Sequence, residues 1–172
     1  MYKLIYFILH YFARIYWTLI YKYFRSKYNI HKSFRFNGNR IHFYGNGEIV
    51  IAQNSYVGEN TNIQSDDNCI VQIGKGCMIS HNVRTYSSSA VADQDFSKNS
   101  IEIKYGNVII SDYVWIGANV FISPGVKIGN NSVIGANSVV TKDVEKFSIM
   151  GGVPAKLIRF KNQASNVVQN EC

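Results

Sequence analysis

The side chains best suited to proton transfer in this sequence are those of its four histidines: His10, His31, His42 and His81. An imidazole titrates near neutral pH, so it can take a proton from a hydroxyl group as that group attacks a substrate. The three cysteines are scattered and form no CxxC or Cys/His cluster. The sequence therefore favours general-base chemistry without a metal, and it predicts no disulfide framework and a reducing cytoplasm as the compartment.

The elements that must position these groups follow a six-residue repeat. An aliphatic residue falls on every sixth position from Ile110 to Val140, and the residue four further on is small or β-branched. Neither a helix nor an ordinary strand has this period. It predicts an all-β fold, a left-handed parallel β-helix whose chain coils around a triangular prism, with glycine at corners where other residues resist the backbone angles. The inward positions are Ile110, Ile116, Ile122, Ile128, Ile134 and Val140, with Val114, Val120, Val126, Ser132, Ser138 and Val144 in the smaller slots.

The repeat also runs through the earlier part of the chain, with two interruptions. The step from Ile63 to Ile73 is ten residues, which indicates an insertion of four at residues 65–68. Residues 85–107 are polar and cannot follow the repeat, so they are expected to leave the prism as a loop. Such a loop is either a tolerated surface insertion or, as we favour, a carrier of binding residues.

Charge separates residues 1–40 from the remainder. Residues 1–40 hold eight basic and no acidic residues, whereas residues 41–172 hold ten basic and eleven acidic residues. The basic balance therefore gives no reason to expect nucleic-acid binding by the β-helix. We expect a helix and linker over 1–40, the β-helix over 41–160 and a polar tail over 161–172.

The first 28 residues predict an amphipathic helix with a wide apolar and aromatic face. Its polar residues, His10, Arg14, Thr18, Lys22 and Arg25, share one narrow stripe. A signal peptide is not expected because polar residues interrupt the apolar run. A membrane span is disfavoured because an arginine near the bilayer centre is costly. The helix either lies on an anionic membrane surface, which we favour, or packs on its own prism or a neighbouring subunit.

The stretch from Val114 to Asp143, with Gly152-Val153-Pro154-Ala155 after it, resembles the hexapeptide-repeat acyltransferases. The likeness is strongest to O-acetyltransferases related to maltose and galactoside acetyltransferases and to enzymes that modify bacterial capsule and lipopolysaccharide sugars. It implies a homotrimer that binds acetyl-CoA in grooves between prisms. The implied cofactor-binding residues are Ala118 and Ala136 along the pantetheine arm, and Thr141, Lys142 and Arg159 at the nucleotide end.

The resemblance also points to the catalytic base. The galactoside and maltose enzymes carry a loop histidine where this chain aligns Ala90, so that geometry is lost here. The stretch Ile73 to His81 instead resembles serine acetyltransferases, in which an aspartate fifteen residues upstream orients the histidine. This match implies His81 as general base and Asp66 as its partner. His42 is the second candidate base, His31 belongs to the linker, and other acids could replace Asp66: Asp67, Asp93 and Asp95.

Together these features predict an acetyl-CoA-dependent O-acetyltransferase that needs no metal. The expected acceptor is a sugar of a surface polysaccharide or of its lipid-linked precursor, because an anchoring helix suits a glycan or glycolipid. Arg84 and Tyr86 are expected to line the acceptor side. The expected location is the cytoplasm, at the inner face of the membrane. Two alternatives stay open: an N-acetyltransferase for a nucleotide amino sugar, and a trimeric scaffold without catalysis.

Overall fold

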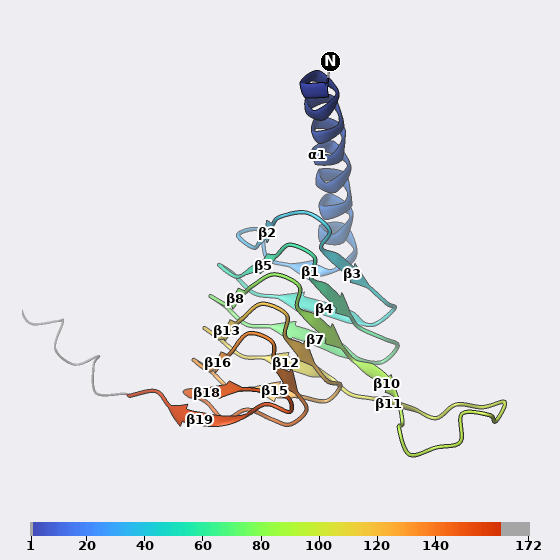
Figure 1. The fold of residues 1–172 in the computed structure, drawn as a ribbon, viewed down its shortest axis with the longest axis vertical. Helices are drawn as coiled ribbons and strands as arrows, with labels where there is room; N and C mark the ends of the chain where they lie inside the picture. Colours follow the sequence, from blue (N-terminus) through green and yellow to red (C-terminus); the bar gives the residue numbers. More distant parts are fainter. Residues whose placement is uncertain (1, 163–172) are drawn as a thin grey trace, which may run out of the picture.

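The computed structural model describes residues 2–162, and its chain forms a left-handed parallel β-helix with one long helix at the N-terminal end (Figure 1). The helix, α1, covers Tyr2–Lys27. Three sheets form the faces of the prism, which we call faces A, B and C. Face A holds β1 (Asn29–Ile30), β4 (Glu48–Ile51), β7 (Ile70–Ile73), β12 (Val108–Ile110) and β15 (Lys127–Ile128). Face B holds β2 (Arg35–Asn37), β5 (Tyr56–Gly58), β8 (Met78–Ile79), β13 (Trp115–Ile116), β16 (Val133–Ile134), β18 (Ser148–Gly151) and β19 (Lys156–Phe160). Face C holds β3 (His42–Tyr44), β6 (Asn62–Gln64), β9 (Arg84–Tyr86), β14 (Phe121–Ile122) and β17 (Val139–Val140).

The predicted inward positions form the core of the prism. The aliphatic series from Ile110 to Val140 is at most 1% exposed, and the series from Val114 to Val144 is at most 4% exposed. Each buried valine or isoleucine stabilises the fold by roughly 1.5–3 kcal/mol relative to exposure. The buried hydroxyls of Ser132 and Ser138 donate to backbone carbonyls at 2.7 Å, so polar groups in the small slots are satisfied. The repeat therefore predicted the core correctly.

The reason for the corner glycines differs from the prediction. Gly117, Gly129 and Gly135 do not have positive φ angles. A Cβ atom at Gly117 would lie 2.6 Å from the backbone nitrogen of Ala136, and one at Gly129 would lie 2.5 Å from that of Lys146. At these two positions glycine is needed because successive coils approach closely. Asparagine instead supplies positive φ at many corners, as it tolerates this conformation better than most residues.

The insertion at residues 65–68 is confirmed, but the polar segment leaves the prism later than expected. Thr85 and Ser87 are buried at the coil, and Thr85 occupies a slot that the repeat gives to an aliphatic residue. Tyr86 lies in β9 and therefore belongs to face C. Beyond Ser87, β10 (Ser88–Ala90) and β11 (Ile103–Tyr105) pair antiparallel and form an arm that projects from the prism (Figure 1).

The segment expected to be a linker is part of the prism. β1 pairs with β4 in face A, and β2 pairs with β5 in face B, so the first coil begins at Asn29 rather than at residue 41. His31 lies in this coil, where its Nδ1 is 2.8 Å from the Ser33 hydroxyl oxygen. At the other end, most of the predicted polar tail and Cys172 lie outside the described residues.

Helix α1 stands out from the first coil for most of its length (Figure 1). Only its last turns pack on the prism, where Phe24 is 6% exposed; Tyr28, the residue after the helix, is 7% exposed. Packing on the chain's own prism, one of the two predicted alternatives, therefore applies to these turns alone. By length and composition the helix could cross a membrane, since 26 residues span about 39 Å. Arg14 lies near the middle of the helix, so such a span would place an arginine near the bilayer centre, at the energetic cost predicted from the sequence.

Candidate functional site

Three of the predicted site residues share one corner of the prism. The chain turns from face B to face C at Glu59, His81, Ala118 and Ala136 in successive coils, and we call this column the B–C corner. The backbone N–H of Asn119 donates to the His81 carbonyl at 3.1 Å, and the backbone N–H of Asn137 donates to the Ala118 carbonyl at 2.9 Å. The structure thus places the candidate base in line with the two alanines implied in pantetheine binding.

An asparagine ladder holds this corner and was not recognised from the sequence. The Asn82 side chain donates to Asn119 at 2.7 Å, and Asn119 donates to Asn137 at 3.0 Å. All three residues have positive φ angles between 56° and 59°. The signal was present as an asparagine in the same position of successive repeats. The ladder connects three successive coils, beginning at the residue after His81, and fixes the backbone of the candidate site.

The His81 imidazole is exposed, and its Nδ1 accepts a hydrogen bond from the Glu59 backbone amide at 3.0 Å. Gly58 leaves room for the ring, because a Cβ atom there would lie 2.9 Å from Nδ1. A neutral imidazole that accepts at Nδ1 carries its proton on Nε2. In this orientation Nε2 can donate a hydrogen bond. To accept a proton at Nε2, the ring must release the Glu59 amide and change to the tautomer whose proton is on Nδ1.

Asp66 does not pair with His81 in the single chain. It lies where the chain turns from face C to face A, which we call the C–A corner. Its Oδ2 accepts from the Ser88 hydroxyl at 2.8 Å and from the Gln64 side chain at 3.4 Å. The fifteen residues from Asp66 to His81 include part of the four-residue insertion and cross faces A and B. The two residues therefore lie at different corners, although their spacing equals that in the serine acetyltransferases. Asp66 therefore anchors the root of the arm.

The other acids considered as partners also belong to the C–A corner or to the arm that starts there. Asp67 follows Asp66 in the same turn, whereas Asp93 and Asp95 lie between β10 and β11. Hydrogen bonds from Ser97 lower the pKa of the exposed Asp95 carboxyl. None of these four aspartates therefore lies at the B–C corner, where the acidic residue next to His81 is Glu59.

Arg84 and Tyr86 lie on β9 in face C. The Arg84 guanidinium donates to the Asn60 carbonyl, so it adjoins the B–C corner. The Tyr86 ring packs edge-on against Phe121, with 5.5 Å between centroids. Burial, with a smaller effect of the neighbouring Tyr86, raises the pKa of Tyr44 above its usual value. Face C thus presents a row of aromatic and polar groups beside His81.

The residues implied at the nucleotide end of the cofactor are not gathered by one chain. Thr141 and Lys142 are exposed at the C–A corner, whereas Arg159 is exposed on β19 of face B. Ala118 and Ala136 lie at the B–C corner. A single prism therefore does not bring the five residues together.

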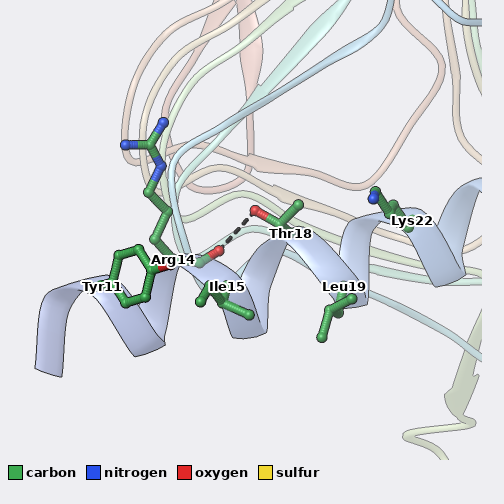
Figure 2. A pocket seen from close by; sticks show the side chains of 6 residues that line it. All are labelled: Tyr11, Arg14, Ile15, Thr18, Leu19 and Lys22. Carbon is green, nitrogen blue, oxygen red and sulfur yellow. Dashed lines mark hydrogen bonds between the residues drawn. The ribbon is translucent and has the colours of Figure 1, made fainter. Parts of the chain in front are cut away.

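The hollows near α1 are of two kinds. One lies between side chains of the helix alone: Tyr11, Arg14, Ile15, Thr18, Leu19 and Lys22 (Figure 2). Figure 2 shows Thr18 bonded to the Arg14 carbonyl, at 2.8 Å, and this hollow is a furrow on one exposed helix. Another, of about 390 Å³, lies between the helix and face C and is lined by residues of α1, β3 and β6. The sequence did not predict the second hollow, which we call the junction pocket.

Comparison with known proteins agrees with the repeat and the fold. A family model described as bacterial transferase hexapeptide (six repeats) matches residues 107–142. The galactoside O-acetyltransferase of Escherichia coli (strain K12) is 38% identical over 119 residues, which are 69% of this chain and 57% of that protein. WbbJ of the same strain, named for O-acetyl transfer in lipopolysaccharide biosynthesis, is 30% identical over 138 residues, which are 76% of this chain and 69% of that protein. The chain thus spans little more than half the length of the galactoside enzyme.

Solved structures show the same architecture. The polySia-specific acetyltransferase NeuO superposes with a TM-score of 0.66 at 31% identity, covering 83% of this chain and 67% of that chain. A galactoside acetyltransferase in complex with coenzyme A superposes with a TM-score of 0.52 at 32% identity, covering 72% of this chain and 66% of that chain. Both likenesses extend beyond the repeats to most of the described chain.

Proposed function

The chain belongs to the bacterial transferase hexapeptide family, and we propose that it transfers an acetyl group from acetyl-CoA to a hydroxyl group of a carbohydrate. One observation carries this proposal: the exposed His81 imidazole lies in the same corner column as Ala118 and Ala136. The relatives support it, since two are named as sugar O-acetyltransferases or as acting in lipopolysaccharide biosynthesis, and one structure contains coenzyme A.

The proposed reaction is general-base acyl transfer. The sugar hydroxyl attacks the thioester carbonyl while the His81 imidazole takes its proton. The tetrahedral intermediate then releases the CoA sulfur, which receives the proton, and the acetyl ester remains on the sugar. For this role the ring turns away from the Glu59 amide and exchanges its proton with solvent, so that Nδ1 holds the resting proton and Nε2 is the base. A backbone N–H group of the corner stabilises the oxyanion.

The cofactor groove in this proposal lies between two prisms of a homotrimer. The B–C corner of one prism supplies His81, Ala118 and Ala136. A neighbouring prism supplies the exposed Thr141 and Lys142, whose donors and charge suit the phosphates of the nucleotide end. Arg159 on β19 adds a second cation. The separation of these residues in one chain supports a shared groove, because a single prism cannot surround the cofactor.

The proposed acceptor is a sugar of a surface polysaccharide or of its lipid-linked precursor, bound along face C beside Arg84 and Tyr86. We also propose that α1 contacts the membrane, where such an acceptor would be anchored. Its large apolar residues are exposed along the projecting turns, for example Leu9, Tyr11 and Phe12 at 62–64%. With eight basic and no acidic residues in 1–40, the helix suits the anionic inner face of the cytoplasmic membrane.

Thiol release from acetyl-CoA across a panel of sugar acceptors tests the function. His81→Ala should lower turnover by about 10²–10⁴ and leave CoA affinity nearly unchanged, because general-base help is lost while the cofactor contacts remain. His10→Ala is the matched control, since His10 is exposed on the projecting helix. Mild base should remove the acetyl group from the product, because esters hydrolyse under conditions in which amides survive.

The contrary results are distinct. Full activity of His81→Ala with loss in His42→Ala would move the base to the first coil. A base-stable product would indicate N-acetyl transfer. An absence of thiol release with every acceptor, in a protein that still binds CoA, would leave the scaffold alternative.

A further inference from the structure

The junction pocket combines aromatic walls with a few neutral polar groups. Helix α1 contributes Tyr16, Trp17 and Tyr23, while face C contributes His42 and Tyr44 of β3 and Asn62 of β6. The Trp17 ring meets His42 edge-on, with 5.3 Å between centroids. No Asp, Glu, Lys or Arg is among the described residues that line the pocket. Concave aromatic sites with a small number of polar groups are typical of small-molecule binding.

This lining suits a neutral ligand with both apolar and hydroxylated surfaces. A sugar ring has C–H faces that pack on aromatic side chains, and its hydroxyl groups bond to amide, imidazole and phenol groups. We infer that the junction pocket binds the membrane-proximal sugar of a lipid-linked acceptor glycan. The inference rests on the proposed function, and it adds a separate binding subsite and a narrower substrate class.

The pocket is held in a fixed position by the packing of the helix base. Tyr21 stacks on Phe36 with 4.2 Å between centroids, and Phe24 stacks on Phe43 at 5.4 Å. The Arg25 guanidinium donates to the Phe34 carbonyl at 2.6 Å. Because these contacts lock the last turns of α1 to the first coil, the two walls of the pocket cannot separate without breaking a buried aromatic cluster.

The pocket also lies where a lipid-linked ligand would arrive. The helix continues from the pocket away from the prism (Figure 1), and its apolar side chains are exposed there. Residues 1–40 hold eight basic and no acidic residues, which complements the phosphate groups that join such a glycan to its lipid. A lipid tail along the helix and a sugar in the pocket would therefore both meet surfaces of matching chemistry.

The distance from the pocket to the candidate base selects which sugar is modified. In face C, His42 of β3 is in register with Asn62 of β6, and Asn62 is in register with Arg84 of β9. Neighbouring strands lie about 4.8 Å apart, so Arg84 is about 10 Å further along the prism than His42. His81 lies at the corner that leads into β9. A glycan that fills the pocket thus presents one of its first few sugars to His81.

Tryptophan fluorescence tests the pocket directly, because the chain has two tryptophans. Trp115→Phe leaves Trp17, in the pocket wall, as the reporter. The full-length protein in detergent is titrated with farnesyl diphosphate carrying one hexose, with farnesyl diphosphate and with the free hexose. We expect saturable binding of the glycolipid, on the order of tenfold tighter than farnesyl diphosphate, because the sugar adds hydrogen bonds and ring contacts.

Two variants separate the pocket from the catalytic step. Tyr16→Ala and Tyr23→Ala should each weaken glycolipid binding on the order of tenfold and raise its KM, with kcat nearly unchanged. Leu19→Ala is the matched control, since Leu19 is exposed in the furrow of Figure 2 and does not line the pocket. A fall in kcat in His42→Gln, with binding intact, would assign His42 to catalysis and overturn its role in the pocket.

The inference is overturned if farnesyl diphosphate binds as tightly as its glycosylated form, because the pocket would then not recognise the sugar. It is also overturned if Trp17 emission changes with protein concentration but not with glycolipid, which would indicate a neighbouring copy in the pocket. Failure of the proposed function gives a different result, namely sugar-dependent binding without thiol release. Normal thiol release with unaltered binding in Tyr23→Ala would refute the pocket alone.

Discussion

Gly58→Ala tests whether the position of the His81 ring matters for turnover. The added Cβ atom would lie 2.9 Å from His81 Nδ1 and 2.8 Å from the Ser80 carbonyl carbon, whereas ordinary contact begins at 3.4 Å. The ring and the adjacent coil must therefore move by about 0.5 Å. Because a displacement of 1 Å can cost about 10²-fold in rate, we expect turnover to fall roughly tenfold to a hundredfold.

The same change should cost stability only moderately. Overpacking of this kind typically costs about 1–3 kcal/mol, and each kcal/mol lowers Tm by about 2–4 °C in a protein of this size. Thermal unfolding and CoA titration, measured beside thiol release, separate displacement of the ring from loss of the fold. Gly151→Ala is the matched control, because its Cβ atom would meet only the flexible end of the Ile158 side chain, at 3.0 Å.

The reasoning fails if folded Gly58→Ala keeps full turnover while His81→Ala loses it, since the base would then tolerate displacement. Equal losses in Gly58→Ala and Gly151→Ala would also refute it, because the effect would not be local to His81.

Two further predictions follow from the separate corners and from the exposed helix. Asp66→Asn should change turnover less than tenfold while increasing hydrogen exchange at the root of the arm, because Asp66 accepts from the Ser88 hydroxyl. A loss of turnover as large as that of His81→Ala would instead indicate that Asp66 acts together with His81, as the resemblance implied. Binding to anionic vesicles should weaken with salt and be lost when residues 2–13 are removed, since these residues expose the apolar face and leave the packed turns intact. Undiminished vesicle binding by this truncated protein would assign the projecting turns another role.

The repeat was sufficient to predict the prism because the choice between inward and outward positions is local. A buried residue every six positions, with a smaller residue between, fills the interior of each coil regardless of distant sequence. The inward residues from Ile110 to Val144 and the insertion at 65–68 were therefore predicted correctly. Thr85 was not, because its β-branched side chain fits the inward slot although the surrounding polar composition indicates a loop.

The candidate site was predicted only in part. The resemblance placed His81, Ala118 and Ala136 in one family site, and the structure places them in one corner column. It also paired Asp66 with His81 by spacing, and the structure separates them because an insertion changes how far around the prism a given number of residues extends. The Glu59 amide, the space at Gly58 and the junction pocket had no motif to reveal them.

The sequence by itself determined the coil, its core and its family, since each depends on residue types repeated along a short stretch. Tertiary structure decided which side chains meet, because contacts between coils join residues 22 apart, as in Glu59 and His81, or 37 apart, as in Asn82 and Asn119 across the arm. These separations depend on every insertion between the partners. The junction of α1 with face C likewise arises only when an aromatic helix base packs on the first coil, so its pocket is a property of the folded chain.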